Sequence, residues 1–184
     1  MPVTYENYCG DTYYLNKKKN KKGNWRYYFA KSKKGELADT IPEGYEIDEK
    51  PNGNVYLIKE KQKLILDEEE NIVNNGIEKY SNIEYFRLYV KENKITIYIA
   101  QDSVSSLKEL INPVQNEKLF RKCLTFSPVL RFILVDKTDR IFEVERYCFR
   151  GFIDDWILLD GGELKDIVKE YCKHLGKDSF YELI

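Results

Sequence analysis

The chain has few of the residues that most enzyme and metal sites require. Its 184 residues include a single histidine, His174. A count of one disfavours both histidine-based zinc sites and the Ser-His-Asp triad. A histidine beside Lys173, near the end of a predicted helix, is also explained by the helix dipole. We therefore expect no zinc enzyme and no classical hydrolase.

Cysteine is also scarce, and the spacing of the four cysteines is uninformative for metal binding. Cys9, Cys123, Cys148 and Cys172 form no C-x-x-C pair, which excludes a zinc ribbon and a thioredoxin-like redox motif. Cys172 and His174 are two residues apart, so on a helix their side chains point about 200° apart and cannot form a local nucleophile–base pair. We expect reduced, partly buried thiols.

Long apolar runs and a targeting signal are absent as well. No apolar stretch approaches the roughly 18 to 20 residues that a transmembrane helix needs. Residues Met1 to Glu6 lack the basic start and apolar core of a secretion signal. The sequence therefore predicts a cytoplasmic protein without a membrane span.

The residues that are abundant favour strands. Hydrophobic residues make up 42% of the chain and charged residues 33%, and there are 15 Tyr and 9 Phe. Aromatic side chains fit the pleated surface of a sheet. We expect an α+β protein with a β-rich module over residues 1–62 and an α+β module over residues 63–184. A single domain is the alternative that this pattern leaves open.

The clearest local structure lies in the carboxy-terminal third. Two β-branched and aromatic segments, Leu130 to Asp136 and Arg140 to Phe149, flank a polar turn and predict a hairpin. A third strand is expected at Trp156 to Leu159, then a helix from Glu163 to Leu175 that stops at Gly176. The apolar stripe of this helix consists of Leu164, Ile167, Val168, Tyr171 and Leu175. This stripe predicts that the helix covers the sheet.

The segment before that helix has two interpretations. Asp160-Gly161-Gly162-Glu163 has the form of a capping box. Two glycines before a helix also occur in phosphate-binding loops, but the lysine and hydroxyl of a P-loop are missing here. We interpret the segment as the start of the helix.

The amino-terminal region predicts two hairpins. Tyr13 to Lys18 and Trp25 to Lys31 flank a polar, glycine-containing loop, and Tyr45 to Glu49 and Asn54 to Glu60 enclose Asn52-Gly53. Four short strands in succession suggest an antiparallel meander. Such a thin sheet needs a cover on its apolar face.

The middle of the chain offers that cover and a further hairpin. Asp67 to Tyr80 begins with four acids and predicts a helix that would lie on the meander, although Gly76 could break it. A third hairpin is expected from Tyr85 to Val90 and Lys94 to Ala100. A short helix is expected at Val104 to Ile111. Its inward-facing residues are predicted to be Leu107, Leu110 and Ile111.

Charge is unevenly distributed in the amino-terminal region. There are nine basic and three acidic residues from Met1 to Glu36, and five basic and eleven acidic from Leu37 to Lys79. These charges can attract each other as solvated neighbours, or the basic part can bind an anionic partner.

The basic loop is the first candidate site. Cations here could meet phosphates and rings could meet bases, which is how many proteins bind nucleic acid or another polyanion. The alternative is a soluble loop, because strand alternation puts Trp25, Tyr27 and Phe29 on one face that would suit a core. The cations and the neighbouring rings are Lys17, Lys18, Lys19, Lys21, Lys22, Arg26, Lys31, Lys33 and Lys34 with Trp25, Tyr27, Tyr28 and Phe29.

A cluster of carboxylates is the second candidate. Paired carboxylates can bind a divalent metal or act as acid and base, which would make the protein a metal-dependent hydrolase. The simpler interpretation is a solvated strand face. The residues concerned are Asp136, Asp139, Glu143, Glu145, Asp154, Asp155 and Asp160.

Three amino-terminal segments resemble a group of uncharacterised bacterial proteins: Cys9 to Leu15, Tyr27-Tyr28-Phe29, and Ile41 to Ile47 with Pro51-Asn52-Gly53. The resemblance implies a recurring module and no activity. We expect a non-enzymatic binding or regulatory protein without a cofactor, with a protein as partner. Nucleic-acid or polyanion binding through the hairpin Lys17 to Lys34 is the first alternative.

Overall fold

The computed structural model describes residues 1–101, 104–150 and 153–183, and of these the side chains of all but residues 149, 150, 153 and 154. The chain forms two compact units, each built from two stretches. Unit 1 consists of residues 1–61 and 102–125, and unit 2 of residues 62–101 and 126–184. The division into a module of residues 1–62 and a module of residues 63–184 stays a prediction. The structure confirms an α+β fold of antiparallel hairpins.

The main sheet of unit 1 is organised around β2. This strand pairs with β3 along one edge, and on the other edge with β1 at its start and β4 further on. All of these pairs are antiparallel. The bounds are β1 Thr4–Glu6, β2 Thr12–Lys19, β3 Trp25–Ala30 and β4 Glu36–Leu37. The first predicted hairpin is thus confirmed, whereas β1 and β4 were not predicted.

The second predicted hairpin is β5 (Tyr45–Glu49) and β6 (Val55–Lys59), which pair with each other in a separate two-stranded sheet. The expected continuous meander is therefore wrong. Unit 1 also contains α2 (Val104–Leu110) and α3 (Glu117–Cys123). Leu110 is 83% exposed, so its predicted inward position is wrong, while Phe120 of α3 is buried.

Unit 2 is a five-stranded antiparallel sheet with helices on one face. The strand order is β11-β10-β9-β8-β7. The third predicted hairpin is confirmed as the pair β7 and β8, and Ile95 and Ile97 of β8 are fully buried. The bounds are β7 Phe86–Lys91, β8 Lys94–Ala100, β9 Phe126–Asp136, β10 Ile141–Arg150 and β11 Ile153–Glu163.

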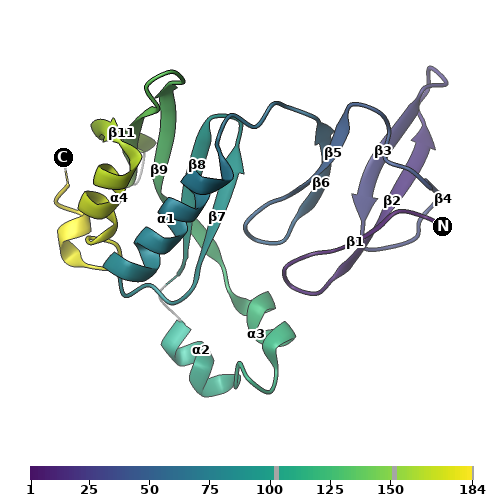
Figure 1. Ribbon diagram of the computed structural model, residues 1–184. Coiled ribbons are helices and arrows are strands. Elements are labelled where there is room, and N and C mark those ends of the chain that lie inside the picture. The colour runs from purple at the N-terminus through teal and green to yellow at the C-terminus, as the bar shows by residue number, and fades with distance from the viewer. Residues whose placement is uncertain (102–103, 151–152, 184) are drawn as a thin grey trace. The chain divides into compact units, whose positions relative to one another are not determined.

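Two helices cover this sheet and complete its core. Figure 1 shows α1 (Asp67–Tyr80) and α4 (Leu164–Cys172) in front of the strands of unit 2. Val73 and Ile77 of α1 join Ile167 of α4 in the buried cluster. The prediction that α4 covers the sheet is confirmed. The prediction that α1 covers the amino-terminal meander is wrong, because its apolar side belongs to the core of unit 2.

The expected capping box before α4 is also wrong. Gly161 and Gly162 belong to β11 and pair with Glu143 and Phe142 of β10, so the strand runs directly into the helix. Glu163 is the N-cap and makes no side-chain cap. The helix ends at Cys172, earlier than predicted, and Gly176 then adopts the expected left-handed conformation with φ of 75°.

Among the helices of the described residues, none is long and apolar enough to cross a lipid bilayer.

Candidate functional site

The loop end of the β2–β3 hairpin carries the densest group of cations in unit 1. Strand register places Lys19 opposite Trp25 and Lys17 opposite Tyr27, while Glu36 of β4 lies opposite Lys17 on the other edge. Cross-strand partners project from the same face of a sheet. One face of the hairpin therefore combines two lysines, an indole ring and one carboxylate.

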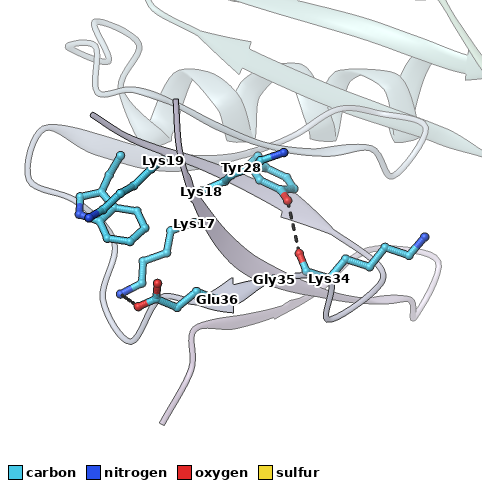
Figure 2. Close-up of a pocket in the computed structure, with 8 residues that line it drawn as sticks. Lys17, Lys18, Lys19, Tyr28, Lys34, Gly35 and Glu36 are labelled. Carbon is cyan, nitrogen blue, oxygen red and sulfur yellow. Dashed lines mark hydrogen bonds and ion pairs between the residues drawn. The ribbon is translucent and has the colours of Figure 1, made fainter. Parts of the chain in front are cut away.

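The other face carries Lys18, Arg26 and Tyr28, because Lys18 pairs with Arg26 and Asn16 with Tyr28. The Tyr28 hydroxyl donates a hydrogen bond of 3.4 Å to the carbonyl oxygen of Lys34. This contact, visible in Figure 2, holds the segment after β3 against the hairpin. Cations thus lie on both faces of the same two strands.

Two adjoining hollows follow the edge of β2. The first has a volume of about 670 Å³ and the second about 580 Å³. Both include Lys18, Lys19 and Tyr28. The edge is accessible here because the described pairing with β4 covers Asn16 and Lys17 and does not extend to the following residues. The first hollow is lined by Lys17, Lys18, Lys19, Trp25, Tyr28, Lys34, Gly35 and Glu36, and the second by Lys18, Lys19, Asn20, Lys21, Arg26 and Tyr28.

Trp25 is exposed rather than part of a core. Its relative exposure is 43%. The ammonium groups of Lys17 and Lys19 lie 5.1 Å and 5.0 Å from its ring centroid, a cation–π arrangement. The interpretation of Trp25 as a core residue is therefore wrong, and Tyr27 and Phe29 are only half-buried.

The loop that joins the two strands is held by its own side chains. The Oδ1 atom of Asn20 accepts hydrogen bonds from the backbone N–H groups of Lys22 and Asn24 at 2.9 Å and 3.0 Å. Gly23 has a φ of 83°, which L-residues with a side chain rarely adopt. The loop therefore presents its lysines from a defined turn.

One carboxylate offsets part of this charge. The Lys17 ammonium lies 2.8 Å from a carboxylate oxygen of Glu36, as Figure 2 shows, and this hydrogen bond raises the pKa of Lys17. Among the described residues, none forms an ion pair with the other cations of the hairpin. These cations are Lys18, Lys19, Lys21, Lys22, Arg26 and Lys34. The hairpin therefore keeps a strong positive charge.

Some of the predicted cations lie elsewhere. The Lys31 ammonium is 2.7 Å from an Asp11 carboxylate oxygen, and the Lys33 ammonium is 4.8 Å from the Tyr14 ring centroid. Neither lysine lines the two hollows, and Lys22 does not line them either. The structure thus brings together most, but not all, of the predicted site.

Glu36 was missed by the sequence analysis. It belongs to a two-residue strand, which is too short to show a period. The available signal was Gly35, whose φ of 112° reverses the chain so that Glu36 returns to the edge of β2.

The carboxylate candidates do not converge. Glu145 forms an ion pair with Arg131, and Asp136 accepts hydrogen bonds from the backbone N–H groups of Asp139 and Thr138, which lower its pKa. Asp160 accepts from the backbone N–H of Gly161. The side chain of Asp154 lies outside the described residues. Within the described part of the chain there is no group of three or more histidine, cysteine or acidic residues that could hold a metal ion.

The cysteine and histidine candidates are also separate. Cys172 is fully buried, and burial raises its thiol pKa to about 12. Such a thiol is protonated at neutral pH and is a poor nucleophile. The His174 Nδ1 atom lies 2.9 Å from the Ser179 hydroxyl oxygen, a local contact that explains its position.

Comparison with protein-family models, with curated proteins and with solved structures finds no match to this chain. The resemblance of the amino-terminal segments to a group of bacterial proteins stays a prediction.

Proposed function

We propose that this chain is a non-enzymatic binding protein that binds nucleic acid through the β2–β3 hairpin. The observation that carries the proposal is a row of lysines and Arg26 without described ion pairs along an open edge that also exposes Trp25. Lysine and arginine side chains that contact phosphates release condensed counterions, which supplies most of the free energy of non-specific binding. A partly exposed ring beside them can contact bases.

Alternative classes lack such support. Hydrolysis by paired carboxylates needs groups that converge on one atom, whereas Glu145, Asp136 and Asp160 are held by separate partners. The basic hairpin, in contrast, is one connected surface made from a continuous stretch of chain.

The first prediction concerns the four lysines around the loop. Replacing Lys18, Lys19, Lys21 and Lys22 by Ser should flatten the dependence of log affinity on log salt by about 0.9 for each lysine that contacts a phosphate. The measurement is fluorescence anisotropy with a labelled 20-nucleotide strand, at two salt concentrations. The parent should lose affinity steeply between low and physiological salt.

The matched control removes the same total charge from elsewhere. Lys59, Lys137, Lys165 and Lys177 are exposed and lie outside the hairpin. Their replacement by Ser should leave the salt slope unchanged, because slope reports contacts rather than net charge. Absence of any binding at low salt with micromolar parent protein contradicts the proposal, and so does a quadruple hairpin variant that retains the parent slope.

The second prediction has the opposite sign. A carboxylate oxygen of Glu36 lies 2.8 Å from the Lys17 ammonium. A phosphate that binds Lys17 must therefore compete with this carboxylate. Glu36→Gln should therefore strengthen binding by roughly two- to fivefold at low salt, since an exposed ion pair contributes little to the free protein. Anisotropy titration measures the change. Glu43→Gln removes an exposed carboxylate that does not line the hollows and should have no effect; weaker binding by the Glu36 variant contradicts the role given to Lys17.

A further inference from the structure

The form of nucleic acid that fits this hairpin can be derived from Trp25. The ring is 43% exposed and lies on a wall of the larger hollow. A duplex keeps the faces of its bases inside the stack, where a side chain on a strand cannot reach them. An unpaired base, in contrast, offers its π-face to an aromatic ring.

The cations around Trp25 are arranged for such a base. The Lys17 and Lys19 ammonium groups contact the ring, at 5.1 Å and 5.0 Å from its centroid. Each lysine side chain is long and flexible, so its ammonium group can also move away from the ring. A base that displaces one ammonium from the ring brings a phosphate on the same nucleotide. The displaced ammonium can then pair with that phosphate, so an ion pair replaces its contact with the ring.

A second ring, from the other face of the hairpin, also lines the first hollow. Tyr28 lines both hollows, and its hydroxyl is bonded to the Lys34 carbonyl oxygen, which fixes the ring. The first hollow has a volume of about 670 Å³ and is open to solvent. Trp25 and Tyr28 project from opposite faces of the hairpin, and both line the first hollow together with Lys17, Lys18 and Lys19. The hollow thus combines rings that can contact bases with cations that can contact phosphates.

We propose that the ligand is single-stranded nucleic acid and that Trp25 stacks on one of its bases. The inference rests on the proposed function, because the lysines must first hold the phosphates. It adds a preference for single strands over duplexes. Charge alone would favour the duplex, because a duplex has the higher phosphate density.

The third prediction tests this with Trp25→Ala and three probes of equal length. The probes are a single strand with bases, the duplex of the same sequence, and an abasic strand that has the phosphates alone. The variant should bind the base-bearing strand roughly tenfold or more weakly, the effect of losing one stacked base. Binding to the abasic strand should change less than twofold, because its contacts are to the lysines.

Two further measurements guard against unfolding of the variant. Trp25→Phe keeps a ring and should retain most of the affinity for the base-bearing strand. In the parent hairpin, fluorescence of Trp25 can be isolated by Trp156→Phe, since the chain has two tryptophans. The base-bearing strand should quench this fluorescence and the abasic strand should not. The same strand made as RNA and as DNA shows whether the sugar is distinguished.

The outcomes separate the two proposals. If Trp25→Ala weakens binding to the base-bearing and abasic strands equally, or to neither, and Trp25 fluorescence is insensitive to bases, the stacking inference is wrong. In that case salt-dependent binding that needs the four lysines still supports the proposed function. Absence of binding to every probe at low salt overturns both.

Discussion

Asp11 is the residue at which the two stretches of unit 1 are held together by charge. One carboxylate oxygen lies 2.7 Å from the Lys31 ammonium just after β3, and the other lies 2.5 Å from the Lys122 ammonium of α3. The hydrogen bond from Lys122, followed by that from Lys31, lowers the pKa of Asp11 below its usual value. The carboxylate thus connects residues that are far apart in the sequence.

The fourth prediction follows from this shift. Asp11→Asn should lower the free energy of unfolding by about 1 kcal/mol at pH 7, a small value because Lys31 is exposed and solvent screens the pair. Since the pKa is lowered in the folded state, the stabilisation is complete above the ordinary value of about 3.9 and is lost as pH falls through the folded value. Urea denaturation at pH 7 and at a series of pH values below about 3.9 measures both. Glu46→Gln, at an exposed site, is the control; a difference that does not shrink as pH falls below about 3.9 would show that charge is not the cause.

Among the elements, α1 and α4 pack closely together at Gly76. A Cβ atom at this position would lie 2.1 Å from the Cγ1 atom of Val168, which is fully enclosed in the core. Glycine inside a helix is unfavourable by about 1 kcal/mol relative to alanine. Here the missing side chain lets the helices pack, so Gly76 does not break α1, which continues to Tyr80.

The fifth prediction is that Gly76→Ala destabilises the protein although alanine favours helices. Overpacking against a stiff β-branched side chain should outweigh the gain in propensity and leave a net loss of about 2 kcal/mol. Chemical denaturation measures it. In a Val168→Ala background the same substitution should be neutral or stabilising, because the contacting methyl group is gone. A parent that becomes more stable with Gly76→Ala would contradict this account of the helix contact.

The hydrophobic periodicity within each segment predicted most helices and strands. Their positions in the fold depend on contacts between segments that are far apart in the sequence. The stripe Leu164, Ile167 and Val168 could be predicted because a period is a property of one segment. The placement of α1 depends on Val168 of a distant helix, and Gly161 is a strand residue because β10 pairs with it. Neither cause is visible within the segment itself.

The candidate site could likewise be predicted only in part from the sequence. Its cations could be identified from composition, because a lysine-rich loop is charged wherever it lies. The exposure of Trp25 depends on which residues pack against β3. The partial neutralisation of the Lys17 charge depends on Glu36, which lies at the edge of β2. Alternation in a strand separates its two faces but does not indicate which face is covered.

At the scale of the whole molecule, the chain passes between the two units three times, after residues 61, 101 and 125. Cutting any one of these links leaves the units joined by the other two. In unit 1, the loop that contains Asp11 meets Lys122 only when the second stretch is present. The two units are therefore interleaved along the sequence.

This interleaving governs what a shortened gene can produce. A product that stops after residue 125 keeps all of unit 1 but also carries β8, whose Ile95 and Ile97 side chains are fully buried in the whole protein. Without β9 those side chains and one backbone edge of β8 lose their cover, which is the usual origin of aggregation. Transplanting the basic hairpin with its native support would instead require two gene segments, residues 1–61 and 102–125, joined by a new linker in place of the forty residues between them.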